Sequence, residues 1–384
     1  MINGKKVCGI ICEYNPFHNG HKYQIEKTKE DTGCEYIICA MSGSMVQRGE
    51  VAIYDKWSRS RAAIMGGADL VIELPAYYVL QSAQNFAAGG VQLLSQLGVT
   101  DILSFGSESG NTDLIKTTAK ISASEPEEFK SILEKNLSAG MGYPAAYHNA
   151  IEAFCGHSLG PNDTLAVNYV SAIEKYNLPL EIYALKRDTG YHDTIAGSSK
   201  NASATAIRKM IDDNGDVSPY VPYIQSSDTY HIHGIESLIL GFFRTVTPSD
   251  IQDVTGMEKG LENRLISCAH KASSLEEFYS MAVSKRYSAH RIKRVVLNSI
   301  MKIKPGYKAD YVRILAFNEK GKEILGQIKK QSNLNIITKT ADFTPEKNSM
   351  FSFDIMATDI ASLCCSNPEN RKSGRDFTTS PVIV

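Results

Sequence analysis

The chain has 384 residues, a hydrophobic fraction of 43% and a formal net charge of −1. This length predicts two domains, and this composition excludes a globally disordered protein. No apolar run approaches the ~20 residues that a membrane-spanning helix needs. The first apolar run, Val7–Cys12, is too short for the core of a signal peptide, so we expect a cytoplasmic protein without membrane contact. The eight cysteines lack metal-ligand spacing, and we expect free thiols and no metal site.

Short apolar runs alternate with helical patterns over the first half of the chain. Strands are predicted at residues 7–12, 35–41, 69–74, 101–105 and 180–185. Helices are predicted at residues 21–32, 56–66, 82–97, 125–136, 161–177 and 203–211. This alternation is typical of an α/β fold, a Rossmann-like parallel sheet with helices on both faces. Ligands of such sheets bind at the carboxyl ends of the strands.

The segment 215–227 contains two prolines and has the composition of a linker. We therefore expect a first domain of residues 1–222 and a second domain of residues 223–384. The second domain is predicted to be mainly α-helical, with one strand at residues 311–317.

The run NPFHNGH, residues 15–21, follows the first predicted strand and opens the first helix. A helix N-terminus offers unpaired N–H groups and partial positive charge, which suit a phosphate group. His18 and His21 can donate hydrogen bonds to phosphoryl oxygens, and Gly20 lets the backbone approach them closely. This H-x-G-H pattern resembles the phosphate-binding signature of HIGH-motif nucleotidyltransferases and class I tRNA synthetases. The alternative is a pair of ordinary surface histidines.

A second signal is the run SATAIR, residues 203–208. In the same superfamily, such a turn opens a late helix. The hydroxyls of Ser203 and Thr205 would face the β- and γ-phosphates, and Arg208 would bind the leaving pyrophosphate. The alternative is an ordinary capped helix. Together the two runs predict attack on the α-phosphate of a nucleotide, with His18, His21 and Arg208 as catalytic residues that stabilise charge.

The loop Met41–Glu50 follows the second predicted strand and carries polar and cationic side chains. Its place at the carboxyl edge of the sheet is typical of a substrate-binding loop. The alternative is a purely structural loop.

Motifs spread in order over nearly the whole chain resemble the bacterial tRNA(Met) cytidine acetate ligases. They are EYNPFHNGH, VQRGE, DKW, ADLVIELP, QSA, SFGSE, PND, YHD, SATAIR, YVRILAF and FTTSPVIV. The resemblance implies that ATP and acetate form acetyl-adenylate, and that the acetyl group passes to the exocyclic amine of the wobble cytidine of elongator tRNA(Met). It implies a nucleotidyltransferase-like catalytic domain and a C-terminal tRNA-binding domain.

The resemblance also implies an ATP site. Its residues would be Ile11, Cys12, Glu13, Tyr14, Asn15, Pro16, Phe17, His18, Asn19, Gly20, His21, Lys22, Tyr23, Gln24, Gly106, Asn162 and Arg187. A magnesium ion would arrive with ATP. The chain departs from the family pattern at Ser44, Met45 and Val51, and also at Asp163 and Thr164 in the segment 161–165. We expect these departures to lie beside the site, where they bear on the acyl group more than on activation.

Positive charge is concentrated in residues 285–339, which hold fourteen Lys and Arg against three acidic residues. This segment carries +11, and the rest of the chain carries −12. We expect it to bind the tRNA backbone, with Tyr287 stacking on an unpaired base. The densest cations, and hence the expected tRNA-binding residues, are Lys285, Arg286, Arg291, Lys293 and Arg294. The alternative is a solvated helix face.

His231 and His233 would lie on one face of a strand, where a metal would lack a third ligand and RNA contact is an option. No obligate protein partner is evident from the sequence. Two other functions stay open. One is a small-molecule adenylyltransferase that makes a dinucleotide-type cofactor. The other is a non-catalytic RNA-binding protein that keeps a nucleotide site as a sensor.

Overall fold

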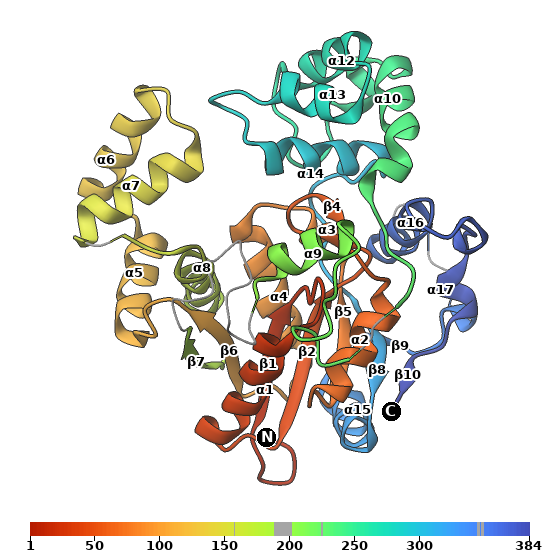
Figure 1. The fold of residues 1–384 in the computed structure, drawn as a ribbon. Helices are drawn as coiled ribbons and strands as arrows, with labels where there is room; N and C mark the ends of the chain where they lie inside the picture. Colours follow the sequence, from red (N-terminus) through yellow and green to blue (C-terminus); the bar gives the residue numbers. More distant parts are fainter. Residues whose placement is uncertain (157, 188–201, 224–225, 344–345, 347–348) are drawn as a thin grey trace.

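The computed structural model describes residues 1–384 except 157, 188–201, 224–225, 344–345 and 347–348 (Figure 1). The described residues form an eight-stranded sheet in the order β10-β8-β5-β2-β1-β6-β7, with β9 beside β8. All its strand pairs are parallel except β5–β8. The strands are β1 (Val7–Cys12), β2 (Tyr36–Ser42), β5 (Leu70–Leu74), β6 (Ile102–Ser107), β7 (Glu181–Lys186), β8 (Tyr311–Phe317), β9 (Asn335–Ile337) and β10 (Val382–Ile383). The expected α/β fold with a Rossmann-like sheet is confirmed.

Helices cover both faces of the sheet because successive side chains of its buried strands point to opposite faces. Val71 belongs to an apolar cluster that includes residues of α1 and α2, whereas Leu70 and Ile72 belong to another cluster, which includes residues of α4, α8 and α15. The helices around the sheet are α1 (Asn19–Thr32), α2 (Lys56–Met65), α3 (Ala76–Val79), α4 (Ala83–Gln96), α8 (Pro161–Lys175), α9 (Ala204–Asp212), α15 (Glu319–Gln331), α16 (Met350–Ser362) and α17 (Arg375–Thr378).

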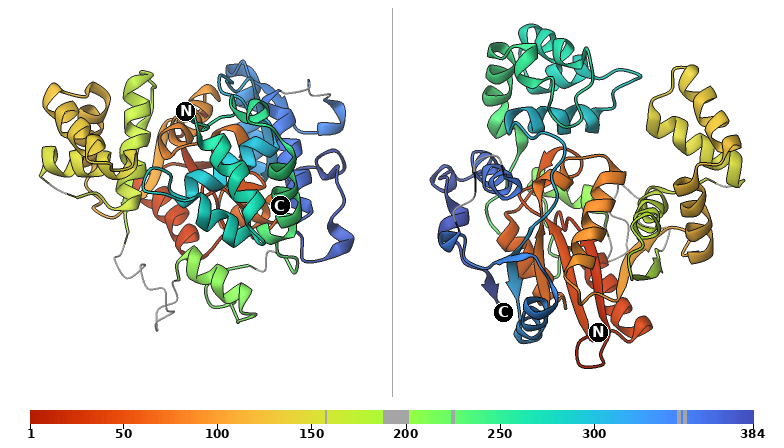
Figure 2. Two further views of the ribbon diagram at one scale, coloured as in Figure 1. Left: turned by 90° about the horizontal axis from the view of Figure 1, so that it is seen from above. Right: turned by 180° about the vertical axis from the view of Figure 1, so that it is seen from behind.

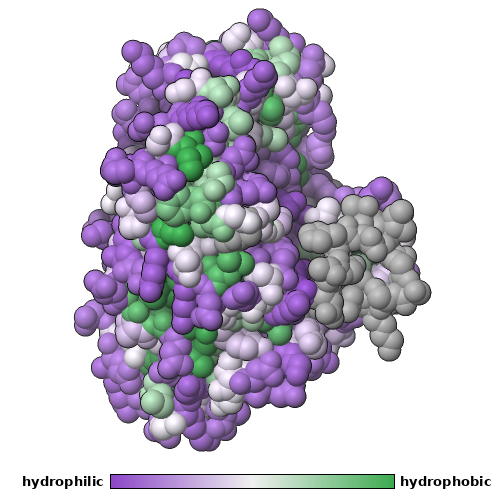
Figure 3. Space-filling view, turned by 90° about the vertical axis from the view of Figure 1, so that its left-hand side faces the viewer, coloured by the Kyte–Doolittle hydropathy of each residue, from purple (hydrophilic) through white to green (hydrophobic). Residues whose placement is uncertain are grey.

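There are two helical lobes: one lies beside the sheet, beyond the β7 edge and next to α8, and the other stands over the carboxyl ends of the strands (Figure 1 and Figure 2). One comprises α5 (Thr112–Ser124), α6 (Glu127–Ser138) and α7 (Tyr143–Cys155). The other comprises α10 (Glu236–Thr245), α11 (Pro248–Ile251), α12 (Leu261–Lys271), α13 (Leu275–Ala282) and α14 (Ala289–Ile300). The face that carries α5–α7 is mostly hydrophilic, with hydrophobic residues in small separate groups (Figure 3). None of the helices in the described ranges is long and apolar enough to cross a bilayer.

The C-terminal part of the chain is mainly helical, as expected, but it also returns to the sheet. Strands β8, β9 and β10 belong to the same sheet as β1, and β8 lies between β5 and β10, antiparallel to β5 and parallel to β10. The expected boundary at residue 222 therefore does not separate the sheet from the rest of the chain. Residues 311–317 form the predicted strand, but a seven-residue apolar run carries no information about the strand it will pair with.

Candidate functional site

A cavity of about 610 Å³ lies at the carboxyl ends of β1, β6 and β7. Its wall includes residues from the β1–α1 loop, the first turn of α1, the loop after β7 and the start of α9. Parallel strands bring these distant segments together because their carboxyl ends meet at one edge. The predicted site residues that line the cavity are Ile11, Cys12, Glu13, Tyr14, Asn15, His18, Gly20, His21, Tyr23, Gln24, Gly106, Asn162, Arg187, Thr205 and Arg208.

The two histidines of the H-x-G-H run stack on each other, with ring centroids 3.7 Å apart. His18 caps α1, and its Nδ1 accepts from the backbone N–H of Gly20 at 3.1 Å. The Nδ1 atom of His21 accepts from the backbone N–H of His18 at 3.3 Å. Each neutral ring therefore carries its proton on Nε2, an assignment that follows from this hydrogen-bond pattern. The pair offers two N–H donors to the cavity that both rings line.

Burial keeps both imidazoles neutral. Together with the nearby cations of Arg187 and Arg208, burial lowers the pKa of His18 to about 3. Burial, His18 and Arg187 place the pKa of His21 well below its usual value. These rings are hydrogen-bond donors at neutral pH, and the positive charge around them belongs to the two arginines.

Arg187 and Arg208 reach the cavity from the loop after β7 and from α9, and each is oriented by a neighbour. Arg208 donates to the carbonyl of Asn15 at 2.6 Å and to the Thr205 hydroxyl at 3.2 Å. Arg187 donates to the Asn162 side chain at 3.0 Å. Two fixed guanidinium groups beside two neutral donors form a site suited to a polyphosphate.

Glu108, the last residue of the SFGSE run, orients Asn162 and was not itself predicted as a site residue. Its carboxylate accepts from the Asn162 side chain at 2.6 Å and from the backbone N–H of Asp163 at 2.8 Å, at the N-terminus of α8. Gly106 lies against the Arg187 side chain, and a Cβ atom there would lie 3.1 Å from Cδ of Arg187, so any larger residue would shift that side chain. The conformation of Arg187 thus depends on both the SFGSE and the PND runs.

The comparisons with known proteins agree with this geometry. The family model described as HIGH Nucleotidyl Transferase matches residues 5–376. The tRNA(Met) cytidine acetate ligase of Acetivibrio thermocellus is 33% identical over 99% of this chain and 100% of that protein. The chain belongs to the tRNA(Met) cytidine acetate ligase family. The resemblance noted in the sequence is confirmed.

Further members of the family support this assignment. The tRNA(Met) cytidine acetate ligase of Caldanaerobacter subterraneus is 35% identical over 94% of this chain and 95% of that protein. A crystal structure of Thermotoga maritima TmcAL bound with alpha-thio ATP matches with a TM-score of 0.87 and 29% identity, covering 99% of each chain. Its apo form matches with a TM-score of 0.85, 29% identity and the same coverage.

Some predicted ATP-binding residues of this ligase-family chain do not line the cavity. Phe17 is buried in the core, 4.9 Å from the ring of Tyr14. Asn19 donates to the carbonyl of Pro219 at 2.9 Å, and the Lys22 ammonium lies 6.0 Å from the ring of Tyr223. Pro16 and Ser203 are also outside the lining; Pro16 follows a cis peptide bond, and Ser203 caps α9. These five residues therefore contribute to the packing of the segments from which the cavity residues project.

The YHD run, residues 191–193, lies outside the described residues.

The cavity also has apolar and polar lining residues that were not predicted individually. Phe86, Phe105, Leu165 and Tyr169 are ordinary core residues by sequence pattern. By contrast, Gln47, Arg48 and Glu50 belong to the loop expected to bind substrate, and they do line the cavity. The position of that loop after a strand was the signal that located them.

Arg59 is a buried cation that the sequence patterns did not reveal. It donates to the backbone carbonyls of Glu13 at 2.6 Å, Ser42 at 3.0 Å and Tyr54 at 3.0 Å, and also to that of Gly43. The carbonyls of Glu13, Ser42 and Gly43 lie at the ends of β1 and β2, so one side chain on α2 holds together the loops that follow two central strands. Nothing in the helical pattern of residues 56–66 distinguishes Arg59 from a surface cation.

The predicted tRNA-binding residues lie on or beside α14, but most have partners within the protein. Tyr287 is buried, with the guanidinium groups of Arg286 and Arg291 5.5 and 5.2 Å from its ring centroid. Both arginines pair with Glu258, at 2.8 and 2.6 Å. The expected stacking of Tyr287 on a base is therefore wrong. Lys285 is exposed, whereas Lys293 and Arg294 contact the loop at the cavity.

The basic segment as a whole does not form one surface. Arg313 is buried in β8, and the four lysines of α15 lie with that helix on the sheet, away from α14 (Figure 1). The charge was summed over consecutive residues, but the fold places these cations in separate parts of the molecule.

The predicted strand location of His231 and His233 is wrong. Both residues lie at a 3₁₀ turn, and their Nδ1 atoms face Asp212 and Glu276.

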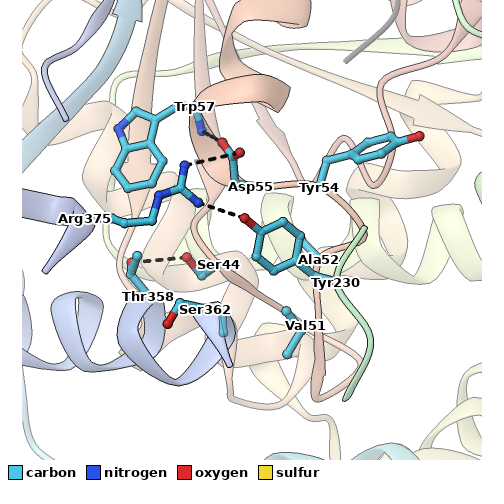
Figure 4. A pocket seen from close by; sticks show the side chains of 11 residues that line it. Ser44, Val51, Ala52, Tyr54, Asp55, Trp57, Tyr230, Thr358, Ser362 and Arg375 are labelled. Carbon is cyan, nitrogen blue, oxygen red and sulfur yellow. Dashed lines mark hydrogen bonds and ion pairs between the residues drawn. The ribbon is translucent and has the colours of Figure 1, made fainter. Parts of the chain in front are cut away.

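Two of the family departures, Ser44 and Val51, lie at a second, much smaller pocket of about 10 Å³, room for roughly one water molecule. Ser44 and Val51 are among its lining residues (Figure 4). Ser44 donates to the hydroxyl of Thr358 at 3.1 Å. Ser44, Met45 and Val51 are absent from the lining of the large cavity, so any influence on the acyl group would be indirect.

Proposed function

We propose that this chain is an ATP-dependent ligase that activates acetate as acetyl-adenylate and transfers the acetyl group to the wobble cytidine of elongator tRNA(Met), forming N4-acetylcytidine. The observation that carries the proposal is the convergence of four groups on one cavity in a chain of this family. These groups are the Nε2–H donors of His18 and His21 and the guanidinium groups of Arg187 and Arg208.

In the first step, a carboxylate oxygen of acetate attacks the α-phosphorus of ATP. A P–O bond to acetate forms, the bond to the bridging oxygen breaks, and pyrophosphate leaves. Charge accumulates on phosphoryl oxygens, and fixed donors and cations stabilise it without reorganisation. His18 and His21 would donate to these oxygens, and Arg208 would hold the pyrophosphate. Magnesium arrives with ATP and neutralises part of its charge.

In the second step, the exocyclic amine attacks the acetyl carbonyl. A C–N bond forms, the C–O bond to AMP breaks, AMP leaves and the amine loses one proton. No protein nucleophile is needed, which agrees with a cavity in which the central groups are donors and cations. Lys285 and the outer face of α14 are proposed to meet the tRNA backbone.

The test is mass spectrometry of tRNA nucleosides after reaction with ATP, isotopically labelled acetate and elongator tRNA(Met). The expected products are AMP and labelled N4-acetylcytidine, and omission of acetate should abolish both. Failure to form either product would overturn the proposal. Pyrophosphate exchange that needs a small phosphate ester and not acetate would favour the dinucleotide-type adenylyltransferase, and ATP binding without turnover would favour a sensor.

Charge reversal on the outer face of the helical lobe should weaken tRNA binding. Lys285→Glu is expected to lower the affinity and to reduce the slope of log K against log salt by roughly one for each phosphate that the variant no longer neutralises. Filter binding at several salt concentrations measures this slope. Lys130→Glu on α6 is the matched control, because Lys130 is exposed and lies in the other lobe. An equal loss of tRNA affinity in Lys130→Glu would show that binding depends on the net charge of the protein and not on this face, and would contradict the prediction.

A further inference from the structure

The hairpin between β3 (Met45–Val46) and β4 (Glu50–Val51) forms one wall of the cavity. We call residues 46–50 the cavity hairpin. Four of its five residues line the cavity: Val46, Gln47, Arg48 and Glu50. A two-stranded hairpin on its own is marginally stable, so its position must depend on its neighbours.

Helix α14 of the helical lobe contacts this hairpin on the side away from the cavity. The Lys293 ammonium lies 2.6 Å from the carboxylate of Glu50, with about a quarter to a third of each side chain exposed (23% and 32%). Arg294 donates to the backbone carbonyl of Gln47 at 3.1 Å. Neither Lys293 nor Arg294 lines the cavity, so both can act on it only through the hairpin.

Gly49 shows how closely the two segments pack. Its φ of +76° is in the left-handed region, and an added Cβ atom would lie 2.6 Å from the backbone nitrogen of Arg294 and 2.7 Å from the carbonyl carbon of Lys293. These are backbone atoms of a helix, which cannot rotate away. A single methyl group at Gly49 would therefore push α14 and the hairpin apart.

The backbone N–H of Gln47 binds a residue that lines the cavity. The carboxylate of Glu13, at the end of β1, accepts from the backbone N–H of Gln47 at 2.7 Å. Gln47 thus has its N–H bound to the residue that follows β1 and its carbonyl bound to α14. This gives a continuous line of contacts from the helical lobe, through one peptide segment, to a residue that lines the cavity.

We infer that Lys293 and Arg294 are positioning residues of the nucleotide cavity, which hold the cavity hairpin in place for the activation step. They were expected to be tRNA-binding cations, but their observed partners are Glu50 and the carbonyl of Gln47. The inference rests on the proposed function, because it assigns them a role in adenylate formation. That role does not require tRNA.

The test is ATP–pyrophosphate exchange with acetate in the absence of tRNA, using Lys293→Met, Arg294→Met and Gly49→Ala. Each variant is expected to lower kcat/KM roughly ten- to hundredfold, since a small misplacement of a cavity wall disturbs the alignment of the reactants. Gly49→Ala removes no charge, so its effect cannot come from weaker attraction to RNA. Lys293→Arg keeps the ion pair and should recover most of the rate.

Lys304→Met is the matched control. Lys304 belongs to the same basic segment and is 61% exposed beside Asp253 at 3.8 Å, away from the hairpin. Its exchange rate should equal that of the wild type. The unfolding midpoint of each variant is measured as well, to establish that the variant is folded under the conditions of the exchange assay. Wild-type exchange in Lys293→Met and Gly49→Ala, with weakened tRNA binding in Lys293→Met, would overturn the inference. Absence of exchange in the wild type would instead overturn the proposed function.

Discussion

Replacing His18 or His21 with alanine should reduce acetyl-adenylate formation about a hundred- to a thousandfold, the effect of losing a preorganised donor to a charged transition state. Each ring presents one Nε2–H to the cavity, because its Nδ1 is occupied by a backbone N–H. The measurement is ATP–pyrophosphate exchange with acetate. Loss of kcat/KM with a small change in KM for ATP would locate the interaction in the transition state.

His18→Asn separates the structural role of this histidine from its chemical role. Asparagine is a favourable N-cap residue, so its side-chain oxygen can accept from the N–H of Gly20 and preserve the start of α1. It cannot extend an N–H donor as far as Nε2 of the imidazole. We expect wild-type stability with alanine-like activity, whereas near-normal activity in His18→Asn would show that only the cap matters.

The pH dependence provides an independent check on the same histidines. Because burial lowers the pKa of His18 to about 3 and that of His21 well below its usual value, neither ring gains a proton near the ordinary histidine pKa. The profile of kcat/KM reports ionisations of the free enzyme. It should therefore show no loss of activity centred near pH 6.5. A limb there that disappears in His18→Asn would contradict the neutral assignment.

Local patterns predicted the elements of the fold and the motifs at the site, because they depend on nearby residues. The helix after β1 begins at Asn19, two residues before the expected start, because His18 itself is the cap. The partner of β8 could not be predicted, because strand pairing between residues about 240 apart is set by tertiary packing. For the same reason Arg59 had no sequence signal, and the SFGSE run contained Glu108 without revealing its partner Asn162, which is 54 residues away.

In the basic segment, residues 285–339, the sequence pattern is real but its interpretation was too simple, because every cation was counted as available to RNA. A cation on a helix is available to RNA only if no carboxylate in the protein binds it first. Arg291 and Lys293 have such partners in Glu258 and Glu50, which lie outside the segment that was counted. Charge totals therefore locate basic helices well but do not reveal which cations are available to a ligand.

A buried ionic cluster joins four segments that are distant in the sequence. The ammonium of Lys56 on α2 lies 2.8 Å from Glu73 on β5 and 2.9 Å from Asp376 on α17, and Arg313 on β8 lies 2.8 Å from Asp376. All four side chains are at most 2% exposed. Two cations balance two carboxylates, so removal of one member leaves an uncompensated charge in the core.

Lys56→Met keeps the side-chain volume and should lower the free energy of unfolding by about 3–5 kcal/mol, measured by urea denaturation. Adding Glu73→Gln restores the charge balance and should recover much of the loss. Lys130→Met at an exposed ion pair is the control.

Asp376 provides a second test of the cluster, through the pH dependence of stability. Burial raises its pKa, but Lys56 and Arg313 outweigh burial and lower it overall. The unfolded chain therefore binds this proton first as the pH falls, and wild-type stability should drop below about pH 4. Lys56→Met removes one of these cations, so its loss of stability in acid should be shallower; an unchanged acid dependence would show that Lys56 does not stabilise the ionised Asp376.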